Sequence, residues 1–380
     1  MDVRGKFGGG GVLWVVAWGL SWGLASAALG QWVTPQVSAP RVEYRTFVSQ
    51  AAGTAVSFHV YTPPAYDAEA SARFPVLYWL HGSGSATSGI ATVSNWFGEA
   101  MARGDVPPML VVFANGIANS MYCDAADGTR PVETVIMEEL IPHVDATFRT
   151  IPTRRGRIVE GFSMGGYGAG RFGFKYSERF AAASMLGAGP VQLDFMNPPP
   201  GTNVSPAVRA AIYEDVWNSD PALYFAASPW NLAAVHAVAI VANGVLVRMA
   251  VGQSDAMLGP NEDLHEHLTT LGIAHGWETH PGVGHEPLAL MQAMGTENWE
   301  FYRAALAPRC GSVDFNGDGS SFDPQDIDAF LSVFSEGPCV PEGAACGDVD
   351  FNNDGSLFDP CDIDSFLLVF SEGPCTLCGV

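Results

Sequence analysis

Five short apolar runs alternate with helical patterns between residues 75 and 251, and this alternation constrains the fold more than any other feature. The runs are continuous, which is typical of parallel strands covered on both faces, and they occupy 75–80, 109–113, 157–159, 182–185 and 245–251. Before them, extended stretches at 42–44 and 55–61 flank Ala51–Thr54, so a β-hairpin is expected. The chain is therefore expected to adopt an α/β fold with a mostly parallel central sheet.

Two further segments lie between these runs. In 132–140, apolar residues form one helical stripe, which predicts an amphipathic helix. Residues 190–231 contain three consecutive prolines at 198–200 and scattered aromatic residues, and we expect an irregular insertion over the sheet. Long insertions of this kind often form part of a binding site.

Composition divides the chain near residue 309. The 380 residues carry a net charge of -22, and residues 310–380 hold 14 acidic residues but no Lys or Arg. Six of the seven cysteines also lie in that tail. A chain this acidic is a poor partner for nucleic acid, because phosphate would repel it. We expect one domain at 31–309 and a small module at 310–380.

Residues 1–30 are typical of a secretory signal peptide. Arg4 and Lys6 are followed by an uncharged stretch from Gly11 to Gly30, with small residues at Ala25–Ala28 for cleavage. An uncleaved membrane anchor is the alternative, because about twenty uncharged residues can span a bilayer. Cleavage would release the protein into the periplasm, the medium or the cell surface, where disulfides persist.

The sequence Gly161-Phe162-Ser163-Met164-Gly165 follows one apolar run and precedes a helical stretch. This context is typical of a nucleophile elbow, a sharp strand-to-helix turn that exposes a serine hydroxyl. A glycine-rich turn that merely contains a serine is the alternative. Serine is a weak nucleophile, so a catalytic role requires a base that is itself held by a carboxylate.

Asp255 and His285 are the expected partners of Ser163. Asp255 follows the run at 245–251, and His285 lies in a glycine-rich loop thirty residues later. Both positions fall where the carboxyl ends of parallel strands open, and their order along the chain suits such a fold. The competing candidates are less well placed. His280 belongs to an expected strand, and Glu286 is adjacent to His285 itself. The others belong to an expected helix, namely Glu262, Asp263, His265 and His267.

A third element is Leu80-His81-Gly82-Ser83-Gly84, directly after the first apolar run. The backbone N–H of Gly82 or Ser83, together with that of Met164, is expected to stabilise the oxyanion. We expect His81 to be a packed structural residue. The nucleophilic catalysis expected from these residues requires no metal or cofactor.

Taken in order, four motifs resemble the putative-esterase family of α/β-hydrolases, which includes feruloyl esterases, acetyl xylan esterases, esterase D and mycolyltransferases. The motifs are His81–Gly84, Glu139–Asp145, Gly161–Gly168 and Gly284-His285. The resemblance covers about residues 41–307 and implies an α/β-hydrolase fold, a Ser163-Asp255-His285 triad and carboxylic-ester chemistry. The substrate loops, 85–96 and 190–231, vary among members, so the acyl group is left open.

The tail contains a tandem repeat with a period of 36 residues. Across 314–339 and 350–375, 21 of 26 positions are identical. Each copy opens with oxygen-bearing side chains at positions one, three and five and then a glycine, as calcium loops do. The closing Asp falls at position thirteen rather than twelve. The expected Ca²⁺ ligands are Asp314, Asn316, Asp318, Asp323 and Asp326, with Asp350, Asn352, Asp354, Asp359 and Asp362 in the second copy.

The tail cysteines are expected to form disulfides, since the chain is predicted to be exported. A bridge within each repeat, Cys310 with Cys339 and Cys346 with Cys375, is the simplest pairing and leaves Cys361 with Cys378. Six cysteines allow fourteen other pairings. Zinc binding at 375–378 is less favoured, because no second such pair exists. Cys123, in the large domain, is expected to be a buried thiol.

The two half-hands resemble dockerin modules, a resemblance that implies a protein partner or attachment to the cell surface. The leading hypothesis is a secreted serine carboxylesterase that acts on a small-molecule or polysaccharide-linked ester. The alternatives are a mycolyltransferase-like acyltransferase and a calcium-dependent adhesion protein with an inert hydrolase domain.

Overall fold

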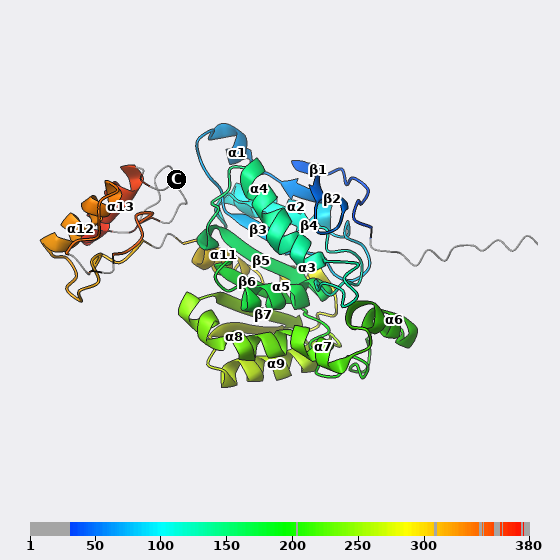
Figure 1. Ribbon diagram of the computed structural model, residues 1–380. Coiled ribbons are helices and arrows are strands. Elements are labelled where there is room, and N and C mark those ends of the chain that lie inside the picture. The colour runs from blue at the N-terminus through cyan, green and yellow to red at the C-terminus, as the bar shows by residue number, and fades with distance from the viewer. Residues whose placement is uncertain are drawn as a thin grey trace, which may run out of the picture. The chain divides into compact units, whose positions relative to one another are not determined.

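The computed structural model describes residues 31–202, 204–307, 310–341, 344, 346–352, 358, 360–373 and 375. The predicted signal peptide lies outside this range. Eight strands form one sheet in the order β1-β2-β4-β3-β5-β6-β7-β8 (Figure 1). They are β1 Val42–Ser49, β2 Thr54–Tyr61, β3 Val76–Leu80, β4 Leu110–Ala114, β5 Arg157–Phe162, β6 Ala182–Leu186, β7 Leu246–Gly252 and β8 His275–His280.

The sheet is parallel from β4 to β8, and an antiparallel hairpin forms its other edge. Strands β1 and β2 pair antiparallel with Ser49 opposite Thr54, and β2 pairs antiparallel with β4. The remaining neighbours pair parallel. This confirms the expected α/β fold with a mostly parallel sheet and the expected hairpin.

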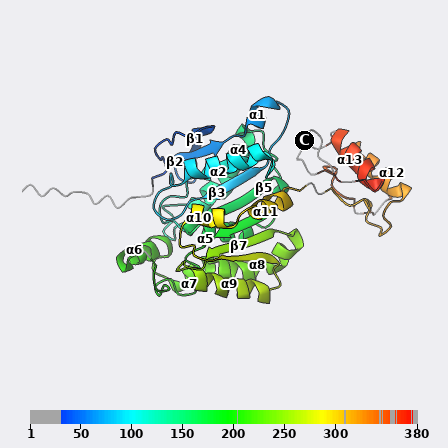
Figure 2. The same ribbon diagram turned by 180° about the vertical axis from the view of Figure 1, so that it is seen from behind.

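Helices cover both faces of the sheet. Side chains of β3 alternate between two apolar clusters, with Tyr78 and Leu80 in one and Leu77 and Trp79 in the other. Helices α5 and α8 cover the first face (Figure 1), and α2, α10 and α11 cover the second (Figure 2). The helices of this part are α1 Pro64–Ala68, α2 Ile90–Arg103, α3 Val132–Thr134, α4 Ile141–Thr147, α5 Met164–Lys175, α6 Pro206–Trp217, α7 Pro221–Ala227, α8 Pro229–Asn243, α9 Leu258–Thr270, α10 Pro287–Ala293 and α11 Asn298–Ala305.

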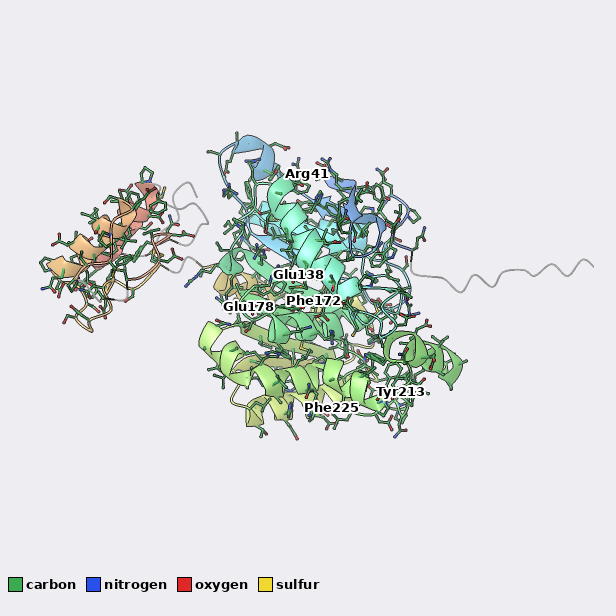
Figure 3. The ribbon with its side chains drawn as sticks, viewed as in Figure 1. Arg41, Glu138, Phe172, Glu178, Tyr213 and Phe225 are labelled. Carbon is green, nitrogen blue, oxygen red and sulfur yellow. A yellow bond between two sulfur atoms is a disulfide. The ribbon has the colours of Figure 1, made fainter. Side chains whose placement is uncertain are left out.

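Two helical expectations are refined by the structure. The stripe at 132–140 is helical, but its second part, Val135–Leu140, is a π-helical segment between α3 and α4. Residues 190–231 are not wholly irregular, because they contain α6 and α7 (Figure 3). An aromatic cluster supplies their core, with Phe195 stacked on Tyr213 and contacting Trp217 and Tyr224. This tertiary packing explains why local sequence did not reveal the helices.

Within the described residues, no single helix is long and apolar enough to cross a bilayer, whereas the bent pair α7 and α8 meets both conditions together.

A buried polar network joins the central strands. Arg248 of β7 bonds Glu160 of β5 at 2.8 Å, Ser184 of β6 at 3.0 Å and Asn298 at the start of α11 at 2.7 Å. The Tyr302 hydroxyl also donates to Glu160, at 2.8 Å. Burial raises the pKa of Tyr302 well above its ordinary value, so its hydroxyl stays a neutral donor. The network therefore fixes three adjacent strands relative to one another.

The tail has its own apolar core and contains two helices, α12 Pro324–Phe334 and α13 Pro360–Phe370. Phe330 and Phe366, which occupy equivalent places in the two repeats, stack with ring centroids 4.2 Å apart. The backbone exchanges equivalent bonds, Gly311 N–H to the Phe351 carbonyl and Gly347 N–H to the Phe315 carbonyl, each 2.8 Å. The first residues of each repeat are thus hydrogen-bonded to the other repeat.

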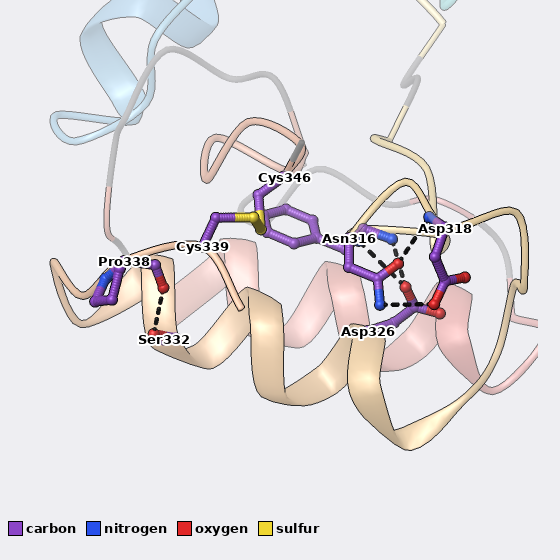
Figure 4. The surroundings of a disulfide bond; sticks show 8 residues. Asn316, Asp318, Asp326, Ser332, Pro338, Cys339 and Cys346 are labelled. Atoms are coloured by element: carbon purple, nitrogen blue, oxygen red, sulfur yellow. Dashed lines mark hydrogen bonds between the residues drawn. A yellow bond between two sulfur atoms is a disulfide. The ribbon is translucent and has the colours of Figure 1, made fainter. Parts of the chain in front are cut away.

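The predicted pairing of cysteines within each repeat is wrong, and these backbone bonds between the repeats explain why. The bridges are Cys310–Cys375 and Cys339–Cys346 (Figure 4), so both join the two repeats. The cause is that Cys310 and Cys346 each precede a glycine that is bonded to the opposite repeat. Cys361 is also disulfide-bonded, while its predicted partner, Cys378, lies outside the described residues.

We predict that Arg248→Met destabilises the protein by about 3–5 kcal/mol, because it leaves the Glu160 carboxylate buried without its cation. The free energy of unfolding, measured by urea titration, checks this. The control is Arg103→Met, whose side chain is 54% exposed and pairs with the exposed Glu99 and the half-buried Asp105, and a loss of about 1 kcal/mol or less is expected there. Equal losses in the two variants would contradict the structural role of the network.

Candidate active site

Ser163 occupies the turn between β5 and α5. Its φ of 58° and ψ of -119° lie in a region that non-glycine residues seldom adopt, at a cost of about 1–3 kcal/mol. The surrounding backbone holds this conformation, because Ser163 N–H donates to the Leu186 carbonyl at 2.9 Å and Gly189 N–H donates to the Ser163 carbonyl at 3.1 Å. The turn is therefore the strained elbow expected from the sequence.

The glycines on either side of Ser163 are required by close backbone packing. A Cβ on Gly165 would lie 1.9 Å from the Leu80 carbonyl oxygen, and a Cβ on Gly161 would lie 2.4 Å from the Gly165 carbonyl carbon. No side chain fits in either place. The spacing Gly-x-Ser-x-Gly thus follows from the contact between α5 and the ends of β3 and β5.

The structure brings the three predicted side chains together. His285 Nε2 lies 2.8 Å from Ser163 Oγ, and His285 Nδ1 lies 2.7 Å from Asp255 Oδ2. The Asp255 side chain is buried, and its Oδ1 accepts the Met257 N–H at 2.8 Å. Because one carboxylate oxygen is held by the backbone, the other is fixed in direction toward the imidazole.

The loops that carry Asp255 and His285 are joined by their backbones. Ser254 N–H donates to the Val283 carbonyl at 2.9 Å, and a Cβ on Gly252 would lie 2.2 Å from that same oxygen. On the other side, the Phe162 ring packs against the His285 ring with centroids 4.6 Å apart. Sequence reasoning did not find this contact, because Phe162 occupies a variable position of the elbow motif.

The candidate oxyanion donors lie beside Ser163. A Cβ on Gly82 would be 3.6 Å from Ser163 Cβ, so the segment Gly82-Ser83 passes directly next to Ser163. Met164 is the first residue of α5, and its N–H belongs to the first helical turn, where amides lack intrahelical acceptors and favour an anion. Both segments are therefore placed to receive negative charge that develops on a carbonyl oxygen.

The competing candidates lie elsewhere. His280 ends β8 and faces Glu278 at 3.4 Å, and Glu262 and Asp263 are on α9, as expected. His265 and His267 are also on α9, where each stacks on a tryptophan, Trp277 and Trp230 respectively, and is half-buried.

The first acidic loop of the tail is held by its own side chains (Figure 4). Asp314 Oδ2 accepts the Gly319 N–H at 3.0 Å, and Asn316 Oδ1 accepts the Asp318 N–H at 2.9 Å. Asp326 accepts the Phe315 N–H at 2.8 Å, and Asp323 caps α12. Asp350, Asn352 and Asp362 are buried in the second copy, while Asp354 and Asp359 lie outside the described residues. Among the described residues, no group of three or more His, Cys, Asp or Glu has a metal-binding arrangement.

Comparison with known proteins identifies a family and a shared fold. The model of a family described as "Putative esterase" matches residues 49–311, more than two thirds of the chain. A ferulic acid esterase structure is similar in fold, with a TM-score of 0.53 and 23% identity over 70% of this chain and 94% of that one.

Two curated relatives are similar over part of their length. Esterase Rv1288 of Mycobacterium tuberculosis is 35% identical over 159 residues, which are 40% of this chain and 33% of the relative. An endo-1,4-beta-xylanase/feruloyl esterase of Xylanibacter ruminicola is 28% identical over 156 residues, 39% of this chain and 22% of the relative. The matched region therefore spans a third or less of these relatives.

We predict that Gly165→Ala abolishes covalent labelling of Ser163 and destabilises the fold by about 1–3 kcal/mol, because the added methyl overlaps the Leu80 carbonyl. The matched control is Gly259→Ala on α9, where a Cβ meets nothing within 4 Å. There a gain of up to about 1 kcal/mol is expected from helix propensity. Thermal unfolding and covalent labelling of Ser163 by a fluorophosphonate measure both effects, and normal labelling of Gly165→Ala would contradict the packing argument.

Proposed function

Because the chain belongs to the family described as "Putative esterase", we propose that it hydrolyses carboxylic esters through an acyl-enzyme formed on Ser163. One observation carries the proposal: Ser163 Oγ, the His285 imidazole and the Asp255 carboxylate form a continuous hydrogen-bonded relay at a strained elbow. A nucleophile bonded to a base that is oriented by a third group is the structural signature of nucleophilic catalysis.

In the proposed mechanism, His285 Nε2 takes the proton of Ser163 as Oγ attacks the ester carbonyl carbon. Asp255 holds the proton on His285 Nδ1 and stabilises the imidazolium that forms. Backbone N–H groups at Gly82 or Ser83 and at Met164 stabilise the oxyanion, and each such donor contributes about 2.7–4 kcal/mol in comparable hydrolases. His285 then protonates the leaving alcohol, and water hydrolyses the acyl-enzyme by the same steps in reverse.

The proposed substrates are feruloyl or acetyl esters that decorate polysaccharides. The names of two similar proteins, a ferulic acid esterase and an endo-1,4-beta-xylanase/feruloyl esterase, support this class. Export through residues 1–30 would bring the enzyme to polysaccharides outside the cell. Small-molecule esters of the same acids are the alternative substrates.

We predict that Ser163→Ala lowers hydrolysis of p-nitrophenyl acetate by about 10⁶-fold, leaving only the residual turnover that binding and the oxyanion donors supply, with little change in melting temperature. The full chain is then assayed on feruloyl, acetyl and longer-chain esters of xylan and of simple alcohols. A higher kcat/KM on feruloylated or acetylated xylan than on the matching methyl ester supports the polysaccharide substrates. Undiminished turnover by Ser163→Ala would refute the proposed acyl-enzyme.

For the tail, we propose dockerin-like calcium binding and attachment to a protein partner or the cell surface. The first loop fits a hard cation in one respect: Asp314 Oδ1 is buried and has no hydrogen-bond partner within the described part of the chain. Asp314, Asn316 and Asp318 would supply the oxygen ligands, and the charge of the ion would offset their mutual repulsion.

We predict that millimolar calcium raises the melting temperature of the tail in the full chain relative to EDTA. An ion present at 100 times its Kd stabilises the folded state by about 2.7 kcal/mol. Asp314→Ala with Asp350→Ala should remove most of this effect. The matched control is Asp328→Ala with Asp364→Ala, which removes two equivalent exposed acids of α12 and α13. Identical unfolding in calcium and EDTA would refute the calcium proposal.

A further inference from the structure

His81, at the end of β3, is buried, and both of its ring nitrogens are engaged by backbone groups. Its Nδ1 lies 2.7 Å from the carbonyl oxygen of Gly82, and its Nε2 lies 3.2 Å from the amide nitrogen of Gly116. The side chain therefore bridges the segment next to Ser163 and the loop that follows β4.

These partners determine the protonation state of His81. An amide N–H can only donate, so Nε2 is the acceptor for Gly116. A carbonyl oxygen can only accept, so Nδ1 carries the proton that is donated to Gly82. Burial lowers the pKa of His81 to about 4, which keeps this neutral form through the ordinary pH range.

The bond to Gly82 also orients the next amide. A trans peptide is planar, and its C=O and N–H point in opposite directions. The peptide that joins Gly82 to Ser83 is trans. Because His81 holds the Gly82 carbonyl on the side of the buried ring, the Ser83 N–H points to the opposite side.

The preceding peptide is held in the same way. The Tyr122 hydroxyl donates to the His81 carbonyl at 3.0 Å, so the Gly82 N–H points away from Tyr122. The Tyr122 ring is itself tightly enclosed, since a Cβ on Gly116 would lie 2.2 Å from it and a Cβ on Gly168 of α5 would lie 2.5 Å from it. Two consecutive carbonyls beside the nucleophile are thus anchored in the interior.

The loop that supplies these contacts is strained. Four non-glycine residues between 117 and 122 have φ between 52° and 60°, namely Ile117, Asn119, Met121 and Tyr122. Such conformations cost of order 1–3 kcal/mol each and persist where the surroundings enforce them. Here the unusual path brings both the Gly116 N–H and the Tyr122 hydroxyl to His81.

We propose that His81 is a positioning residue that aims the Ser83 N–H at the oxyanion by holding the Gly82 carbonyl, with Tyr122 aiming the Gly82 N–H through the His81 carbonyl. The role rests on the proposed esterase function. His81 touches neither the substrate nor Ser163 Oγ, and it acts only through the backbone. The neutral ring serves as donor and acceptor at once, which no charged side chain can do.

Two substitutions test the two hydrogen bonds of the His81 ring separately. His81→Asn places an amide N–H near the position of Nδ1 and keeps the donor to Gly82, whereas His81→Gln places an amide oxygen near Nε2 and keeps only the acceptor for Gly116. We expect His81→Gln to lower kcat/KM for p-nitrophenyl acetate by about 10–100-fold, somewhat less than the loss of an entire oxyanion donor. His81→Asn should retain at least about tenfold more of that kcat/KM.

A second readout distinguishes positioning from structural support. A trifluoromethyl ketone forms a charged hemiketal on Ser163, so its affinity should fall in proportion to kcat/KM, while the melting temperature need not follow either. Tyr122→Phe removes only the hydroxyl and should lower both quantities together by a smaller factor. His236→Gln on α8, a histidine that forms none of the contacts described for His81, is the control and should leave both unchanged.

Equal losses in His81→Asn and His81→Gln, or a loss of kcat/KM without loss of ketone affinity, would overturn the positioning role while leaving the esterase intact. Undiminished turnover by Ser163→Ala would instead refute the esterase proposal and, with it, this role. The two failures are therefore distinguishable in one set of assays.

Discussion

The contact on which the site depends is the approach of α5 to the end of β3, where a Cβ on Gly165 would lie 1.9 Å from the Leu80 carbonyl. At this distance the helix begins directly against the strand that continues into His81 and Gly82. The positions of Ser163, of the first amide of the helix and of the segment Gly82-Ser83 are thus set by one backbone contact. A larger residue at 165 would push α5 away from β3 and so separate all of them. The geometry of the site therefore depends first on this backbone packing.

Much of this arrangement could be predicted because its determinants are local. Continuous apolar runs identify buried parallel strands, and the glycines around Ser163 identify the elbow, since both depend on neighbours in sequence. Asp255 and His285 followed from the rule that functional side chains gather at the carboxyl ends of strands. The choice of these two over Asp263 and His280 needed only the assignment of each residue to a loop, a helix or a strand.

The features that were missed depend on contacts between distant segments. The helices within 190–231 form around an aromatic cluster that includes Phe195 and Tyr224, and no local periodicity reports it. The disulfides join the two tail repeats because each repeat begins against the other, whereas sequence spacing favoured bridges within a repeat. The role of His81 likewise requires Tyr122, 41 residues away, and a loop whose unusual φ values occur at residues without a glycine signature.

The three members of the relay are supported unequally. Glu160 lies three residues before Ser163, and Arg248 lies seven before Asp255, so the buried ion pair between them ties together the strands that precede Ser163 and Asp255. His285 instead lies in a loop, with its side chain 32% exposed, and is held by Asp255, by the Phe162 ring and by the backbone bond at Val283. In the proposed mechanism, His285 moves a proton between Ser163 and the leaving group while Ser163 and Asp255 stay in place. The buried strands before Ser163 and Asp255, and the loop that carries the partly exposed His285, fit this proposed division of roles.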